Sequence, residues 1–139
     1  MKINRVYKGS GTFLEYTITS VMLTGILIIM VSIFIKRYSI ENFELYSDQI
    51  ARDIVTCTSL EEAQELAEEE AETFFSEIST IKDDDINVFV EYAAGSPEEW
   101  RKGNFIVLYI EGTINPLIAT GTTNYYTRTL MMIEKNGGR

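Results

Sequence analysis

Histidine is absent from the 139-residue chain, and only one cysteine and two prolines occur in it. Without histidine, the commonest general base and many metal-ligand sets are missing. Neither a Walker A loop, a GxGxxG motif nor a GxSxG motif is present. We therefore expect no enzymatic activity, no metal ion and no cofactor. Aspartate-only or Ser-Lys catalysis is the alternative that these absences leave open.

The single cysteine, Cys57, excludes a disulfide bond within the chain, so packing alone must hold the fold together. A lone cysteine is most often a small, buried, apolar side chain. We expect this role for Cys57. An intermolecular bond or a reactive thiol is the alternative.

Basic residues are scarce after the first part of the chain. Residues 1–37 carry five basic residues and one acidic residue, whereas residues 38–139 carry seven basic and twenty acidic residues. An acidic body argues against nucleic acid as a partner, because phosphate contacts need a basic surface. It also argues against a body that lies flat on an anionic membrane surface. We expect no small-molecule substrate either.

A run of twenty residues without a charge, residues 16–35, follows the basic N-terminus. As a helix it is about 30 Å long, which is the thickness of the hydrocarbon core of a bilayer. Apolar residues occupy all of its faces, unlike those of an amphipathic soluble helix. No small-x-small cleavage site follows it, so removal as a secretory signal is not expected. The sequence thus predicts a basic leader at residues 1–9, a transmembrane anchor at 10–37 and a domain at 38–139.

The orientation of the anchor follows from its flanking charges. Lys2, Arg5 and Lys8 precede the uncharged run, and Lys36 and Arg37 follow it. The excess of positive charge on the N-terminal side favours a cytoplasmic N-terminus. We expect a single-pass protein of the cytoplasmic membrane whose C-terminal domain lies outside the cytoplasm.

Glu15 is the only acidic residue among the first forty, and it stands directly before the uncharged run. A carboxylate at that depth is costly unless it meets a cation or stays at the membrane interface. One interpretation is an interfacial glutamate whose carboxylate reaches water. The other is a glutamate that serves assembly.

The assembly interpretation rests on a resemblance. A short basic leader, Lys8-Gly-Ser-Gly11, then Glu15-Tyr16 and a long apolar helix resemble the prepilin pattern, and the Glu-Tyr pair resembles that of Flp-type pilins. With its large C-terminal part, the chain looks like a TadE-like or TadF-like pseudopilin of tight-adherence systems. The resemblance implies a prepilin peptidase, other pilin subunits and an inner pilus platform as partners. It also implies that the new N-terminal ammonium meets the glutamate of a neighbouring subunit.

The expected site comprises Gly9, Ser10, Gly11, Glu15 and Tyr16. In the family the peptidase cuts after the glycine, and the glutamate becomes the fifth residue of the mature chain. Here a cut after Gly9 makes Glu15 the sixth residue, and a cut after Gly11 makes it the fourth. A cut after Ser10 restores the fifth position without a preceding glycine. The basic-Gly-small junction favours Gly9.

Two helical patterns follow the anchor. The first continues to about Val55 as an amphipathic stalk, because apolar or small residues recur at steps of three and four: Ile40, Phe43, Ser47, Ile50 and Ile54. The second begins with Ser59 as N-cap and Glu62 completing a capping box. Its predicted apolar stripe is Leu60, Ala63, Ala67, Ala71, Phe74 and Ile78. Its seven intervening glutamates predict a solvated face, with a basic partner as the alternative.

A switch to period two after the helices predicts three strands, at residues 86–92, 105–113 and 122–134. The middle strand is apolar on both faces and should be central. Asp83-Asp84-Asp85 predicts a turn and lacks the alternation of a Ca²⁺ loop, which is the alternative. Trp100, in the loop before the second strand, is expected to cover the core or to be a contact anchor in a filament.

Helices followed by a three-stranded antiparallel meander predict an α+β fold. The order is also similar to that of TadE-like proteins, in which a strand leads to Pro-Leu, here Asn115-Pro116-Leu117, and the last strand ends in an acid, here Met132-Ile133-Glu134. The resemblance implies a minor pilin or pseudopilin of a pilus or secretion filament. One alternative is an unprocessed single-pass protein with an extracytoplasmic ligand- or protein-binding domain. Another is a membrane subunit of a larger conjugation or secretion complex.

Overall fold

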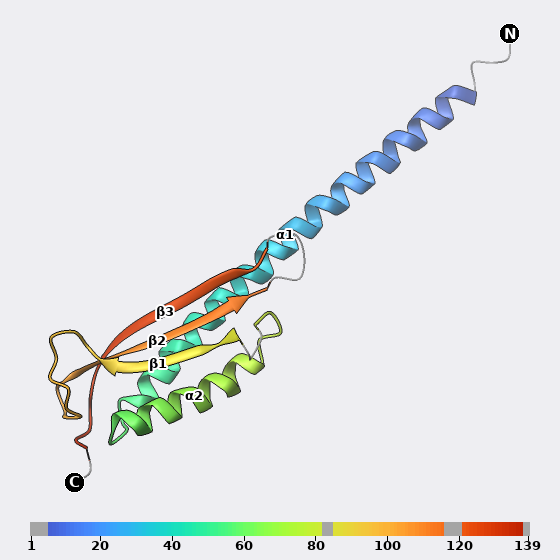
Figure 1. Cartoon of the computed structure of the whole chain (residues 1–139). Helices are drawn as coiled ribbons and strands as arrows, with labels where there is room; N and C mark the ends of the chain where they lie inside the picture. The colour runs from blue at the N-terminus through green and yellow to red at the C-terminus, as the bar shows by residue number, and fades with distance from the viewer. Residues whose placement is uncertain (1–5, 82–84, 116–120, 138–139) are drawn as a thin grey trace.

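A computed structural model describes residues 6–81, 85–115 and 121–137. It contains two helices, α1 (Val6–Ile54) and α2 (Leu60–Ser76), followed by three strands, β1 (Asn87–Tyr92), β2 (Phe105–Ile114) and β3 (Thr123–Met132). Helix α1 projects far beyond the rest of the molecule, and the strands lie alongside its C-terminal half (Figure 1). The predicted α+β class and element order are confirmed. Asp83, Asp84, Pro116 and Leu117, which carried sequence predictions, lie outside the described residues.

Helix α1 is continuous over 49 residues, or about 70 Å. It contains no proline, and threonine hydroxyls in its N-terminal half bond back to backbone carbonyls four residues earlier. The hydroxyl of Thr17 donates to the Phe13 carbonyl oxygen at 2.9 Å, and that of Thr24 donates to the Ser20 carbonyl oxygen at 2.8 Å. These bonds satisfy the hydroxyl groups within an otherwise apolar stretch.

The sheet is an antiparallel meander in the order β1-β2-β3. Its register pairs Val88 with Ile110 in the first ladder and Ile110 with Thr127 in the second. Strand β2 is central, and both Val107 and Leu108 are buried in it, as the sequence predicted. Because side chains alternate along each strand, one face of the sheet turns toward the helices and the other turns away.

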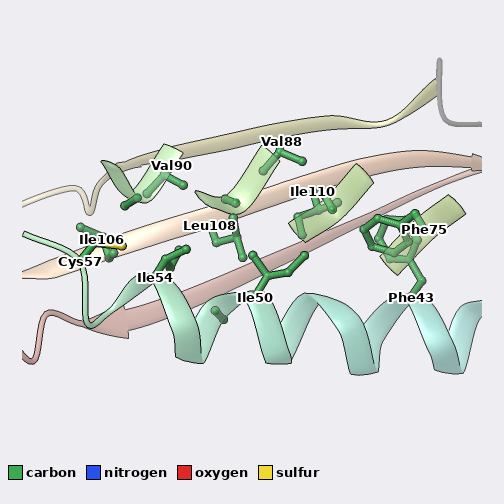
Figure 2. Packing of buried hydrophobic residues seen from close by; sticks show 14 of the residues in the cluster. Phe43, Ile50, Ile54, Cys57, Phe75, Val88, Val90, Ile106, Leu108 and Ile110 are labelled. Carbon is green, nitrogen blue, oxygen red and sulfur yellow. The ribbon is translucent and has the colours of Figure 1, made fainter. Parts of the chain in front are cut away.

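The core lies between the sheet and both helices. Figure 2 shows Phe43, Ile50 and Ile54 of α1 directed toward the inward-facing residues of β1 and β2. Each fully buried side chain of this size stabilises the fold by about 1.5–3 kcal/mol. The predicted stalk is thus confirmed as the half of α1 whose apolar face the body covers.

Helix α2 begins as predicted at Ser59, whose hydroxyl accepts the Glu62 amide at 3.1 Å. The second hydrogen bond of the predicted capping box is made to Thr58, one residue before the N-cap residue Ser59. The Glu62 carboxylate accepts from the backbone amide of Thr58 at 2.7 Å and from its hydroxyl at 2.6 Å, so it does not bond the amide of the N-cap residue. These hydrogen bonds lower the pKa of Glu62, because they favour the charged carboxylate.

The predicted apolar stripe of α2 is wrong at one position. The buried residues are spaced four apart and end at Phe75, not Phe74. Phe74 is half-buried and stacks on Tyr46 of α1, with ring centroids 5.1 Å apart. Ile78 is buried but lies beyond the end of α2. Because the buried residues from Ala63 to Ala71 are alanines, α2 can lie close to α1 and the sheet. Phe75, four residues after Ala71, points inward on the same face.

The outer edge of β1 is occupied by a side chain of α2. Gln64 donates from its amide nitrogen to the Val88 carbonyl oxygen at 2.8 Å, and its amide oxygen accepts the Val90 amide at 2.7 Å. The glutamine therefore bonds the edge as a neighbouring strand would. Unpaired strand edges invite aggregation, and this contact pairs two backbone groups of the β1 edge, at Val88 and Val90.

Trp100 packs against the core, half-buried, and its indole nitrogen donates to the Cys57 carbonyl oxygen at 2.9 Å. The predicted covering role is confirmed. Cys57 is buried and free, as expected for a small apolar side chain. Burial raises the pKa of its thiol, with a smaller contribution from nearby glutamates.

Candidate functional site

All five residues of the expected site lie on α1. The helix begins at Val6 and passes through Gly9, Ser10 and Gly11 to Glu15 and Tyr16 without interruption. Residues 6–9 of the predicted leader and the apolar run therefore belong to one helix, and residues 1–5 lie outside the described residues. The structure brings no residue from elsewhere in the described chain to this end of α1, which projects away from the body (Figure 1).

Helical geometry fixes the spacing between the glycines and Glu15. Gly9 lies six residues before Glu15, about 9 Å along the axis and on a different face of the helix. Gly11 lies four residues before Glu15, on the same face and about 6 Å away along the axis. A Cβ atom added at Gly11 would meet nothing within 4 Å, so packing within the chain does not require glycine there.

The Glu15 side chain is exposed to the surroundings of the helix. Its backbone carbonyl accepts the Thr19 hydroxyl at 2.8 Å, and the neighbouring Tyr16 is 75 % exposed. Over the described residues a single ion pair is formed, between Arg37 and Glu41 at 3.1 Å. Among the side chains that the structure describes, none forms an ion pair with the Glu15 carboxylate.

The surface of α1 after Glu15 is apolar on every side. No side chain between residues 11 and 31 is buried, and the large exposed ones are Phe13, Leu14, Ile18, Val21, Met22, Leu23, Ile26, Leu27, Ile28, Ile29, Met30 and Val31. The most apolar stretch has a mean hydropathy of 2.6. Helix α1, near the N-terminus, is therefore long and apolar enough to cross a membrane.

The first hydrogen bond between α1 and the described body lies at Ser39, which is buried. The Ser39 hydroxyl lies 2.6 Å from that of Thr80, and each hydroxyl can donate to the other. Polar, small residues thus make the first contacts between the helix and the body. The uncovered apolar length lies N-terminal to this point.

Further along, β3 and α1 are joined by polar contacts. The Thr127 hydroxyl donates to the Ser47 hydroxyl at 3.0 Å, and the Tyr125 hydroxyl donates to the Glu44 carboxylate. The hydrogen bond to Glu44, aided by burial, raises the pKa of Tyr125 to about 12. These two contacts join β3 to the stalk through side-chain hydrogen bonds.

Phe43 is the apolar centre of the same junction. Its ring is fully buried, 4.7 Å from the Phe75 ring and 5.4 Å from the Tyr125 ring between centroids. A Cβ atom at Gly112 would lie 2.8 Å from Cε2 of Phe43. Sequence reasoning missed Gly112, and only its place within an otherwise bulky strand pointed to a close approach.

Sequence reasoning also missed Glu70, which it assigned to the solvated face of α2. Glu70 is half-buried, and one carboxylate oxygen is buried without a hydrogen-bond partner. Burial, followed by the nearby Asp53 of α1, raises the pKa of Glu70 to about 7. The sequence did contain an indication that Glu70 is buried, because Ala63, Ala67 and Glu70 are spaced four and then three residues apart, as on the buried face of a helix.

No family model matches the chain, and neither a curated protein nor a solved structure does. Among residues 6–81, 85–115 and 121–137, no three cysteine, aspartate or glutamate side chains are grouped so that they could hold a metal ion. Helix α1, with its exposed apolar segment and the body packed on its C-terminal half, is the main candidate for a functional element.

Proposed function

We propose that this protein is a minor pilin or pseudopilin, inserted in the cytoplasmic membrane by α1 and assembled into, or priming, a tight-adherence pilus or secretion filament. Its N-terminus lies in the cytoplasm and its body, residues 38–139, lies outside and reaches the cell surface in a pilus. The observation that carries the proposal is one unbroken helix. It bears the Gly9–Tyr16 motif, a fully exposed apolar segment and the stalk of the body in succession.

The chemistry of assembly follows from the environment of Glu15. In the membrane an ionised carboxylate is costly when unpaired, and so is a free ammonium. Cleavage of the leader creates that ammonium on each subunit. When the carboxylate of one subunit meets the ammonium of its neighbour, both charges are compensated. Because only one axial offset brings the two together, the pair also sets the register between subunits.

The position of the cut decides whether a subunit can pair with itself. After a cut behind Gly9, the ammonium of Ser10 lies about 7.5 Å along the axis from Glu15 and about 140° around the helix. After a cut behind Gly11, the ammonium of Thr12 lies about 4.5 Å away and only about 60° around. The first geometry disfavours a contact within the chain and leaves Glu15 available to a neighbour. Cleavage after Gly9 therefore suits assembly better.

Processing is tested on the full chain produced with and without an active prepilin peptidase. Intact mass and N-terminal sequencing should show a chain beginning at Ser10 when the peptidase is present, and at Met1 when it is absent. Gly9→Val should block the cut, whereas Gly11→Ala, a matched change two residues away, should not. A chain that begins at Met1 in the presence of active peptidase would refute the proposal and favour the unprocessed membrane protein.

The role of Glu15 is tested separately from processing. Glu15→Ala should leave the protein in the carbonate-resistant membrane fraction, because it removes a charge next to an apolar helix. It should nevertheless abolish incorporation into filaments, measured in sheared surface fractions. Glu41→Ala, which removes an exposed glutamate outside the apolar segment, is the control and should assemble normally. Normal assembly of Glu15→Ala would exclude the proposed ion pair between the Glu15 carboxylate and the N-terminal ammonium of a neighbouring subunit.

A further inference from the structure

Several large apolar side chains are exposed on the face of the sheet that turns away from the helices. Large side chains from all three strands lie on it, between 44 % and 74 % exposed: Phe89, Phe105, Tyr126, Leu130 and Met132. We call these five residues the outer patch. Both helices pack on the opposite face, and no described segment covers the outer patch. The domain therefore consists of a helical layer and a sheet, and the exposed apolar side chains lie on the face of the sheet that no third layer of the described chain covers.

The register makes the patch contiguous. Phe89, Tyr109 and Arg128 lie in one row across the three strands, and Phe105 pairs with Met132 at the end of the sheet. The Arg128 guanidinium lies 5.7 Å from the centroid of the Tyr109 ring. Val107, between these rows, is buried although it is not part of the core. The half-buried Tyr109 therefore connects Phe89 of β1 with the residues of β3, whereas Val107 adds no exposed surface.

The patch has the size of an interaction surface. Five large side chains that are each about half exposed contribute roughly 500 Å² of apolar surface, which is near the upper end for a monomeric protein. A stable interface buries about 800 Å² per partner, so the patch and its polar rim suffice. Anchoring in one membrane also raises the effective concentration of two copies, which lowers the affinity that each interface must supply.

Charge distinguishes this face from the rest of the body. Helix α2 exposes six glutamates, Glu61, Glu62, Glu65, Glu68, Glu69 and Glu72. Two copies that approach through α2 repel each other, because like charges across an interface are unfavourable. The outer face carries one cation, Arg128, and two carboxylates, Glu91 and Glu111. It is therefore the surface through which a second copy of this acidic chain can approach.

The direction of the strands selects the symmetry. They lie alongside α1 (Figure 1), so a two-fold axis parallel to the strands keeps both α1 helices parallel and in the same membrane. Such an axis packs the two sheets face to face at about 10 Å. It places β1 of one copy over β3 of the other, with Arg128 opposite Phe89 of the second copy. An axis across the strands would point the second anchor away from the membrane.

We propose that two copies of this chain pair side by side in the membrane through the outer patch, with parallel α1 helices. The pairing rests on anchoring by α1, which is one part of the proposed function. It needs neither cleavage of the leader nor entry into a filament. The symmetric pair buries the only large apolar surface that the described part of the body leaves exposed.

Crosslinking in native membranes tests the pairing on the full chain. Cys57→Ala removes the natural thiol, and Glu111→Cys then introduces a thiol on the central strand, close to the two-fold axis. Glu65→Cys, on the exposed face of α2, is the matched control. A bismaleimide that spans two sheets about 10 Å apart should give a product of twice the chain mass with Glu111→Cys and none with Glu65→Cys. Equal yields from the two positions would overturn the proposal, as would a product whose mass indicates a different protein.

A second pair of variants, made in the Cys57→Ala, Glu111→Cys chain, tests whether the crosslink depends on the outer patch. Leu130→Asp should reduce the crosslinked product at least tenfold, whereas Leu45→Asp on α1 should not. The two leucines are equally exposed, at 60 % and 61 %, so both variants should fold, as judged by Trp100 fluorescence. An unchanged yield with Leu130→Asp would contradict the interface.

The outcomes also separate the two proposals. Processed but monomeric protein in the membrane would refute only the proposed dimer through the outer patch. Paired protein with an intact leader would refute only the pilin function. Protein absent from the carbonate-resistant membrane fraction would refute both, because both require α1 as an anchor.

Discussion

Gly112 lies in β2 opposite the buried ring of Phe43, and its missing side chain is what lets the sheet approach the stalk. A methyl group there would lie 2.8 Å from Cε2 of Phe43. Phe75 and Tyr125 hold that ring on two sides, so it has little room to move. The packing of the sheet on α1 thus depends on the absence of a side chain at Gly112, next to the Phe43 ring.

Gly112→Ala should lower the free energy of unfolding by about 1–3 kcal/mol, the usual range for overpacking a core. Chemical denaturation of the detergent-solubilised chain, followed by Trp100 fluorescence, measures it. Phe43→Leu in the same chain should restore part of the loss, because the smaller side chain vacates the contact. A loss below about 0.5 kcal/mol, the range of ordinary surface changes, would contradict the close approach.

Glu70 is the second residue whose role depends on its surroundings. Its pKa is raised from 4.5 to about 7 in the folded chain, so the folded state holds the proton more tightly than the unfolded state. The contribution of Glu70 to stability is therefore fully present below about pH 4.5 and is lost as the pH rises through about 7.

Glu70→Gln should remove that part of the pH dependence and stabilise the protein at pH 8 by about 1 kcal/mol, the low end of the penalty for a buried polar group without a partner. Urea unfolding at pH 5 and pH 8 gives the comparison. Glu69→Gln, an exposed neighbour, should leave the difference between the two pH values unchanged. The same pH dependence in Glu70→Gln as in the parent chain would show that another group titrates.

At the scale of elements, the two outer strands of the sheet contact the helices in different ways. Gln64 bonds the backbone of β1 at Val88 and Val90, so α2 serves both as a layer over the core and as a closure of that edge. At β3 the helix α1 contributes side-chain contacts to Thr127 and Tyr125. The sheet is thereby oriented along the stalk.

Gln64→Ala should cost about 1–2 kcal/mol, since two hydrogen bonds to the strand are lost. Hydrogen exchange should locate the effect, with faster exchange of the Val90 amide. Gln64→Glu retains an acceptor for that amide but loses the donor to Val88, and should give an intermediate result. Unchanged protection of Val90 in Gln64→Ala would mean that the amide is protected by other means.

At the scale of the whole molecule, a long exposed apolar helix carries an acidic body at one end. The charge of the body disfavours contact with an anionic membrane, and its strands follow the axis of α1 (Figure 1). The body therefore extends along the direction of the anchor, which suits lateral contacts between anchored copies.

The proposed orientation predicts which thiols react from outside the cell. In a Cys57→Ala background, Glu61→Cys should be labelled by a membrane-impermeant maleimide in intact spheroplasts. Asn4→Cys, in cells that lack the peptidase and so retain the leader, should be labelled only after the membrane is permeabilised. The reverse pattern would place the body in the cytoplasm, against the balance of basic residues around the apolar run.

The candidate site stays a prediction from the sequence. Gly9, Ser10, Gly11, Glu15 and Tyr16 stand in the chain where the charges stop and the apolar run begins, and the structure adds that one helix carries them all. Their proposed role involves a second molecule, so no contact within a single chain could reveal it.

The sequence by itself determined the element order, the uncovered apolar length and the buried face of the stalk. These properties depend on periodicity and hydropathy among residues close together in the chain, which the alternation in β1 and the spacing of Phe43, Ile50 and Ile54 record directly. The α+β class follows from the same local patterns.

Only the tertiary structure decided which side chains meet across elements. It turned Phe75 inward in place of Phe74, buried Glu70 beside α1, set Gly112 against Phe43 and left the outer face of the sheet open. Each of these outcomes depends on the relative placement of segments far apart in the chain. Local periodicity does not contain that placement, because several arrangements of the same amphipathic elements bury the same stripes.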